Sequence, residues 1–280
     1  MPETVGALLQ HWRKTRQLSQ LSLATQAQIS SRHLCFVETG RANPSRDMVL
    51  RLANTLDVPL RERNALLLAA GFAPLYAESQ LDAPALAAVK RALDAILLQQ
   101  EPFPAVVMNR RWDIVRTNQA ATRFFGFLLG ERATSAPDNV LKLFFHPDFV
   151  KPHVVNWLAV AQSLVQRVQR EALAGAPDEA TRAVLSEVLS YPGVPSSLRE
   201  PAPDAAPLAP VIPVSFAKAG RGFDFFSAIT TLGTAQDITV QELRIESFFP
   251  IDEATAEAAR ELATPPIASR HQPSPAQDPG

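Results

Sequence analysis

Residues 18–44 constrain the fold more than any other part of the chain, because they carry the pattern of two short helices joined by a tight turn. Ser30 occupies the position at which a hydroxyl caps the second helix, and Gly40 suits a left-handed residue at its end. Apolar residues recur at helical spacing on the inner side of the pair: Leu23, Ala24, Ala27, Ile29, Leu34 and Val37. The polar residues in the first turn of the second helix then face solvent: Ser31, Arg32 and His33.

A capped helix with exposed donors fits the major groove of DNA, where an arginine binds guanine O6 and N7 and a serine or histidine reaches other base edges. Gln20 starts the first helix and is expected to point toward the sugar-phosphate backbone. The loop after the second helix converges on the same side, and Phe36 either packs on a thymine methyl group or shields the core. We therefore predict these DNA-contacting residues: Gln20, Ser30, Ser31, Arg32, His33, Phe36, Arg41, Asn43 and Ser45.

This stretch resembles the phage-repressor (XRE-type) helix-turn-helix family in a specific set of residues: Gln20, Leu23-Ala24, Ile29-Ser30, Glu38-Thr39-Gly40-Arg41 and Pro44-Ser45. The resemblance places a positive φ in the turn, where the family usually has glycine and this chain has Gln28. Apolar periodicity predicts three further helices over residues 4–16, 46–56 and 60–70. Residues 1–72 should therefore form one compact all-α domain of five helices that binds double-stranded DNA.

The charge distribution agrees with a DNA-binding amino-terminal domain followed by a domain of another kind, and the cysteine content indicates the compartment. Residues 1–70 carry nine Lys+Arg and five Asp+Glu, whereas the whole chain has a net charge of −1, so the remainder is acidic. The single cysteine, Cys35, excludes an internal disulfide framework and indicates a reducing compartment. With no signal-peptide pattern and no apolar run long enough for a bilayer, we expect a cytoplasmic protein that does not contact membranes.

The pattern changes after a connecting segment and helix at residues 73–101. Alternating residues predict short strands at 104–109 and 112–118, and Asn118 is placed to cap the helix that follows. Further helices are predicted at 149–173, 177–189 and 254–262, and further strands at 212–217, 223–232 and 238–249. Seven prolines predict a long loop at 192–213, and composition predicts a disordered tail at 264–280. Residues 102–263 should form an α+β domain with one sheet packed against helices.

This second part resembles the MmyB-like ligand-binding domain in the following residues: Pro104–Val107, Trp112-Asp113, Asn118, Asn139, Leu143–Pro147 and Asn156-Trp157. The resemblance implies a PAS-like fold that follows an XRE-type head and holds a fatty-acid-like ligand in its apolar interior. The fold class is then multidomain, with an all-α five-helix helix-turn-helix domain before an α+β PAS-like domain. The proline-rich insert departs from the family and leaves open how the late sheet edge is covered.

Aromatic residues are concentrated in this second domain, as in apolar pockets that bind small molecules. We predict these ligand-binding residues: Met108, Phe124, Phe125, Phe144, His146, His153, Asn156, Trp157 and Phe226. The alternative for each ring is that it only fills the core. His146, Asp148 and His153 lack the spacing of a helical zinc site, and no catalytic or nucleotide-binding motif occurs, so we expect no metal, no cofactor and no enzyme activity.

Together these patterns predict a transcription regulator whose carboxyl-terminal domain binds a small apolar or fatty-acid-like ligand that modulates DNA binding. We expect a homodimer with half-sites about one helical turn (~34 Å) apart. Two alternatives stay open. In one, the second domain serves only for dimerisation or protein interaction, and in the other it is a degenerate enzyme.

Overall fold

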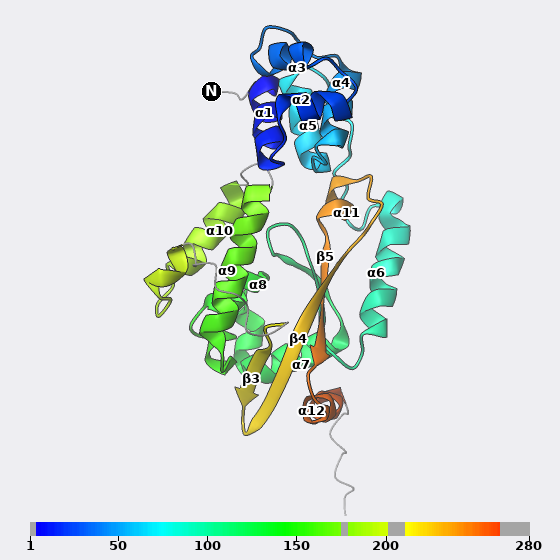
Figure 1. Ribbon diagram of the computed structural model, residues 1–280. Helices are drawn as coiled ribbons and strands as arrows, with labels where there is room; N and C mark the ends of the chain where they lie inside the picture. Colours follow the sequence, from blue (N-terminus) through cyan, green and yellow to red (C-terminus); the bar gives the residue numbers. More distant parts are fainter. Residues whose placement is uncertain (1–3, 175–178, 201–210, 264–280) are drawn as a thin grey trace, which may run out of the picture.

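The computed structural model describes residues 4–174, 179–200 and 211–263 (Figure 1). The predicted tail and residues 201–210 of the predicted proline-rich loop lie outside the described residues. A bundle of short helices stands on a larger domain built around a curled sheet. Within the described ranges, no helix is long and apolar enough to cross a membrane.

Five helices form the amino-terminal domain: α1 (Val5–Thr15), α2 (Gln20–Gln26), α3 (Ser31–Glu38), α4 (Arg46–Thr55) and α5 (Leu60–Ala69). Each of the first four follows a residue whose hydroxyl accepts a hydrogen bond from the backbone N–H three residues on: Thr4, Ser19, Ser30 and Ser45. These hydroxyls satisfy N–H groups that have no partner inside a helix, so local chemistry sets the helix starts. The predicted cap at Ser30 is confirmed.

A small residue lets α1 pack closely against α3, and a residue with positive φ turns the chain between α2 and α3. A Cβ on Gly6 would lie 2.4 Å from the carbonyl oxygen of Val37, so a larger residue would push the two helices apart. Gln28, between α2 and α3, has a φ of 55°, which confirms the positive φ expected there. The core beneath these contacts is formed by fully buried side chains that include Leu9, Trp12, Leu23, Leu34 and Leu52.

The second domain is built on a five-stranded antiparallel sheet of order β2-β1-β5-β4-β3. Its strands are β1 (Ala105–Met108), β2 (Ile114–Thr117), β3 (Val214–Lys218), β4 (Arg221–Thr231) and β5 (Arg244–Pro250). The first strand therefore pairs with the last. With the helices described next, this arrangement confirms the predicted fold class, a helix-turn-helix domain followed by an α+β PAS-like domain.

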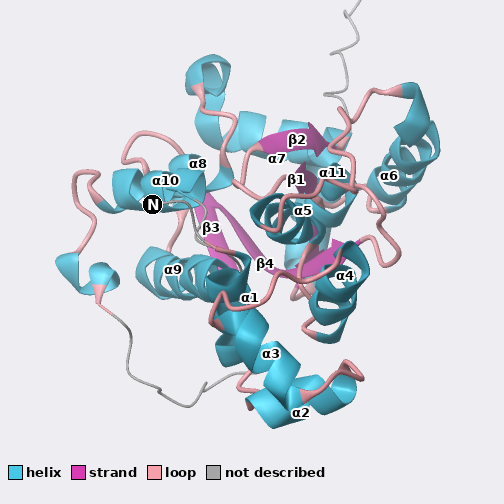
Figure 2. Cartoon of the chain, turned by 90° about the horizontal axis from the view of Figure 1, so that it is seen from above, coloured by secondary structure: helices cyan, strands magenta, loops and turns pink. Residues whose placement is uncertain are grey.

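Helices cover both faces of this sheet (Figure 2). On one face, Leu93 and Leu97 of α6 (Ala87–Gln99) pack against Ala105, Val107 and Ile245. On the other face lie α7 (Gln119–Leu129), α8 (Val140–Phe145), α9 (Trp157–Ala174), α10 (Glu179–Leu189) and α12 (Glu253–Ala263), whose apolar residues join those of β3 and β4 in one large core. Short 3₁₀ helices occur at Pro84–Leu86, Gly130–Ser135, Lys151–His153 and Ser196–Arg199.

The helix predicted from residue 149 is wrong over its first eight residues, because α9 begins only at Trp157. The preceding backbone instead pairs with the edge of the sheet, where the Val155 N–H donates to the carbonyl of Ser215 at 2.8 Å. The amide of Asn156 continues this contact, since its Oδ1 accepts from the Ser215 N–H and its Nδ2 donates to the carbonyl of Pro213. These contacts come from residues about 60 positions away, so helical periodicity alone does not reveal them.

The strand predicted over 238–249 is wrong at its start, where the chain forms the short helix α11 (Ile238–Glu242). Asp237 causes this, because its Oδ1 accepts hydrogen bonds from the N–H groups of Thr239 and Val240 and caps a helical turn. The strand begins at Arg244 after this turn. The helix α11, which replaces the start of the predicted strand, lies directly against α5 of the first domain (Figure 1).

Candidate DNA-binding helix and ligand cavity

Helix α3 presents its first turn on the outside of the domain. Ser31 and Arg32 are exposed and His33 is half-buried, while the Ser30 hydroxyl accepts from the His33 N–H at 3.1 Å. The guanidinium of Arg32 lies 5.4 Å from the ring centroid of Phe36, so the half-buried ring is partly covered by a cation rather than open to solvent. Arg32 and Ser31 are therefore the groups of this helix that stand free of the domain core.

The other predicted DNA-contacting residues flank α3. Arg41 and Asn43 are exposed in the loop before α4, and the exposed Ser45 hydroxyl caps α4 by accepting from the Met48 N–H. Gln20 is half-buried, and its Nε2 donates to Oε2 of Glu38 at 2.8 Å. This contact uses one of the two N–H groups of the amide, so the contact of Gln20 with the DNA backbone stays a prediction.

Glu38 binds a second donor that sequence reasoning missed. Its carboxylate accepts from Nε of Arg13 at 2.7 Å and from Nη2 at 2.9 Å, and its side chain has no exposed surface. Burial alone would raise the pKa of Glu38, but the hydrogen bonds from Arg13 and Gln20 and the charges of Arg13 and Lys14 together hold this pKa below its usual range. The two partners are 25 residues apart, so no local pattern in the sequence pairs them.

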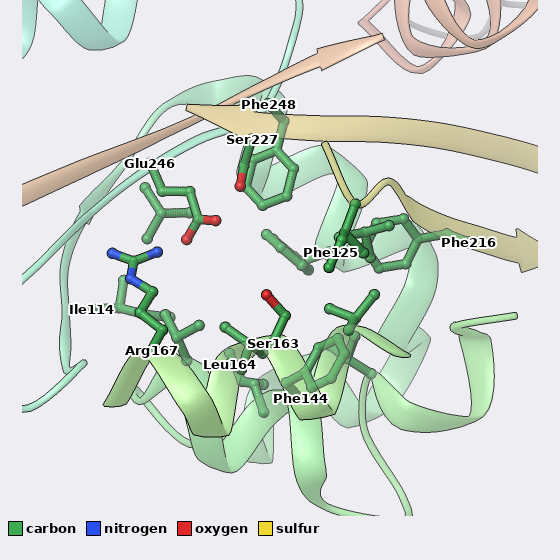
Figure 3. Close-up of a pocket in the computed structure, with 17 residues that line it drawn as sticks. Ile114, Phe125, Phe144, Ser163, Leu164, Arg167, Phe216, Ser227, Glu246 and Phe248 are labelled. Atoms are coloured by element: carbon green, nitrogen blue, oxygen red, sulfur yellow. The ribbon is translucent and has the colours of Figure 1, made fainter. Parts of the chain in front are cut away.

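A cavity of about 160 Å³ lies in the second domain, between the sheet and α9 (Figure 3). Its walls are mainly apolar and come from both layers of the domain, including Ile114, Phe216 and Phe248 from the sheet and Phe125, Phe144 and Leu164 from helices. Such walls bind the apolar part of a small molecule by removing its surface from water.

Polar side chains are gathered at one end of this cavity. Ser163 and Arg167 enter from α9, and Ser227 and Glu246 enter from β4 and β5. Arg167 and Glu246 point toward one another in Figure 3. Burial raises the pKa of Glu246 above its usual range, although a hydrogen bond with Ser227 and the charge of Arg167 act in the opposite direction. The cavity is therefore amphipathic, with an apolar body and a charged end.

Arg167 is held at the cavity by two neighbours. Its Nε donates to Oε1 of Glu171 at 3.1 Å, and its guanidinium lies 4.8 Å from the ring centroid of the fully buried Trp112. Arg244 contacts the same two residues, since its Nη1 donates to Oε2 of Glu171 at 2.7 Å and its guanidinium lies 5.5 Å from the Trp112 ring. One carboxylate is therefore shared between two arginines, of which one lines the cavity.

The structure brings two of the predicted ligand-binding residues, Phe125 and Phe144, to the cavity wall. Met108 and Phe124 lie in the core behind it, where Phe124 packs edge-on against four other phenylalanine rings: Phe125, Phe216, Phe223 and Phe225. Phe226 is on the opposite face of the sheet and stacks on Phe249. Because successive residues of a strand face opposite sides, the lining residue of β4 is its neighbour, Ser227.

The four polar or mixed candidates do not line the cavity either. Asn156 is bonded to the backbone of β3, and Nε1 of Trp157 donates to the carbonyl of Phe144 at 3.0 Å. His146 accepts from the Asp148 N–H through Nδ1, and the pKa of His153 is lowered by burial and by the nearby charges of Lys218 and Arg132. In the described part of the chain, no three His, Cys, Asp or Glu side chains are grouped as metal ligands.

Contacts between α5 and the second domain join the two halves of the molecule, and we call them the domain clasp. The Leu60 N–H donates to Oε1 of Gln241 at 2.7 Å, and Arg61 donates to both carboxylate oxygens of Glu242 at 2.7 and 2.9 Å. The clasp is completed by Arg110, whose Nη1 lies 3.2 Å from Oε1 of Glu62 and 3.4 Å from Oε1 of Glu242. The position of the DNA-binding domain thus depends on charges carried by the second domain.

Comparisons with known proteins agree with this two-part organisation. Residues 89–262 match the family described as the MmyB-like transcription regulator ligand binding domain, and residues 4–66 match a helix-turn-helix domain. No curated protein matches the sequence. A solved structure described as an RNA-binding light-oxygen-voltage receptor aligns with 89% of this chain at 13% identity and a TM-score of 0.26, and this chain spans 59% of its length. A likeness of that size carries no argument about fold or function.

Proposed function

Because the chain belongs to the family of MmyB-like transcription regulators, through the ligand-binding domain at residues 89–262, we propose that a small apolar or fatty-acid-like molecule in the cavity modulates its binding to double-stranded DNA. The helix-turn-helix domain at residues 4–66 supplies the DNA-binding part. The observation that carries the proposal is the amphipathic cavity, since its walls and its charged end suit a molecule with an apolar body and a polar head.

In this proposal α3 enters the major groove with its first turn leading. The exposure of Ser31 and Arg32 supports this orientation, and Arg32 is the residue with the geometry to bind guanine in bidentate fashion. Arg41, Asn43 and Ser45 then contact phosphates beside the groove. Two copies of the chain would place their α3 helices about one helical turn of DNA apart, so we propose a homodimer as the DNA-bound form.

The ligand in this proposal lies with its apolar body along Phe125, Phe144 and Phe216 and its head beside Arg167. An anionic or strongly polar head gains a charge-assisted interaction there, in surroundings where the aromatic walls exclude water. The alternative function, a second domain used only for dimerisation or protein contacts, has no use for a charged group directed into a cavity. Glu246 and Arg167 therefore favour ligand binding.

Mass spectrometry of small molecules extracted from the purified full-length chain tests the proposal, together with binding of laurate as a defined probe. Ser163→Met fills the cavity from α9, and Ala159→Met is a matched control because Ala159 is exposed on the same helix. We expect the wild type and Ala159→Met to carry or bind an amphipathic molecule in stoichiometric amount and Ser163→Met to lose it. Wild-type protein that neither releases such a molecule nor binds laurate would overturn the proposal.

A further inference from the structure

A row of neighbouring charged side chains, which we call the file, leads from the cavity to the domain clasp. It starts at Arg167, passes through Glu171 to Arg244, and reaches Glu242 through Arg110. Three of its contacts are direct, at 3.1 Å from Arg167 to Glu171, 2.7 Å from Arg244 to Glu171 and 3.4 Å from Arg110 to Glu242. The remaining step runs through the sheet, because Arg244 of β5 is paired with Met108 of β1, two residues before Arg110, and the like charges of Arg244 and Arg110 repel one another.

The pKa of Arg244 is shifted by burial and by the charged residues of the same row. Burial lowers this pKa most strongly, Glu171 raises it, and the positive charges of Arg167 and Arg110 lower it. The shared contact with Glu171 places Arg244 near the cavity residue Arg167, and the pairing of Arg244 with Met108 places it near the clasp residue Arg110. Its side chain is only 17% exposed, so these interactions are screened less than those of an exposed surface pair.

The sharing of Glu171 makes this file responsive to what occupies the cavity. With the cavity empty, one carboxylate serves two guanidinium groups, those of Arg167 and Arg244. A polar or anionic head beside Arg167 competes with Glu171 for that guanidinium, which leaves Glu171 to neutralise Arg244 more completely. The repulsion that Arg244 exerts on Arg110 then decreases, and Arg110 is the side chain that pairs with Glu62 of α5.

We propose that Glu171 and Arg244 are positioning residues that couple occupancy of the cavity to the domain clasp, and through the clasp to the placement of α3. This inference rests on the proposed function, because it specifies how the ligand acts on the DNA-binding domain. A ligand modulates binding only if it favours one of two arrangements, and the clasp is the contact whose charge balance differs between them.

Amide hydrogen exchange of the full-length chain at saturating laurate tests the coupling, with the Leu60 N–H as reporter because it donates directly to Gln241 across the clasp. In the wild type we expect laurate to change the exchange rate of this amide by about fivefold or more. Glu171→Gln keeps the size of the side chain but removes the shared charge, and should abolish most of the laurate-induced change. Glu187→Gln is the matched control, since Glu187 forms an ion pair with Lys142 away from the file.

Arg244→Gln provides a second, independent break in the file and should uncouple the reporter in the same way. Measurement at saturating laurate separates coupling from affinity, and the Glu187→Gln control shows how far the loss of an unrelated glutamate charge alone alters the response. If Glu171→Gln or Arg244→Gln keeps the full wild-type response, the coupling route is overturned while ligand-modulated regulation stands. If the wild type binds no laurate and carries no extractable molecule, the proposed function itself fails.

Discussion

Arg13 of α1 and Glu38 of α3 form a buried, two-pronged salt bridge, with Nε 2.7 Å from Oε1 and Nη2 2.9 Å from Oε2. Gln20 of α2 donates to the same carboxylate. Side chains of α1, α2 and α3 therefore meet at the Glu38 carboxylate. Glu38 is the last residue of α3, and the first turn of this helix faces outward. The angle at which α3 leaves the domain is set by this contact as well as by apolar packing.

Arg13→Met should destabilise the DNA-binding domain strongly. The methionine fills most of the space but leaves the Glu38 carboxylate buried without its cation, which costs about 3–5 kcal/mol. Urea denaturation of the full-length protein measures the effect, with Lys14→Met as the control because Lys14 is the exposed neighbour on α1. Equal free energies of unfolding for the two variants would show that the pair contributes little.

Arg32→Ala should lose discrimination at one base pair by about 1–3 kcal/mol, because a bidentate contact to guanine distinguishes the correct base from the other three. Binding is measured on a duplex selected by the protein from a random library and on its single-base variants. Arg51→Ala, an exposed arginine of α4, serves as the control. Weakening of equal size on every duplex would instead make Arg32 a phosphate contact.

Glu246→Gln should stabilise the ligand-free protein at pH 8 and lose that advantage in acid. The raised pKa of Glu246 means that the folded protein holds this proton more tightly than the unfolded chain does. Its ionised form therefore costs stability above the ordinary glutamate pKa, and the cost disappears as pH falls through the raised pKa toward about 4.3.

Denaturation at pH 8 and at pH 4.5 checks the sign of this effect, with Glu257→Gln as an exposed control on α12. A gain that is as large at the lower pH would show that the amide improves packing rather than removing a charge. A loss at pH 8 would mean that the ionised carboxylate is stabilised by Arg167 more than burial costs it.

Phe125→Ala should lower the affinity for laurate about tenfold or more, whereas Phe226→Ala should leave it within about twofold. Both rings are half-buried phenylalanines, but only Phe125 lines the cavity, and loss of its apolar surface removes about 25 cal/mol for each Å² no longer buried by the ligand. Isothermal titration gives both affinities. Equal losses in the two variants would indicate that laurate binds elsewhere or that both changes act through stability.

Local chemistry was sufficient to predict much of the fold. Ser30 and Asn118 accept from N–H groups three residues away, so their capping roles are contained in short stretches of sequence. The starts of α9 and β5 were predicted wrongly because they depend on other contacts. Asn156 is bonded to β3, and Asp237 turns an apolar run that reads as a strand into α11.

The ligand cavity was only partly predictable because its lining depends on which side of an element faces inward. Aromatic character alone was enough to predict Phe125 and Phe144 as lining residues. Ser227 and Phe226 are neighbours in β4, and only Ser227 faces the cavity. A strand sequence without clear alternation of apolar and polar residues does not show which of the two faces inward. The available signal for Glu246 was an acidic residue in a predicted strand that also carries Val240, Leu243, Ile245 and Phe248.

The pairing of β1 with β5 has a consequence for synthesis on the ribosome. The core of the first domain is complete once the chain reaches Phe72, so this domain can fold while the rest is still being translated. The sheet has to wait for residues 244–250, because β5 lies between β1 and β4. A nascent chain therefore completes the helix-turn-helix domain well before it can complete the ligand-binding domain.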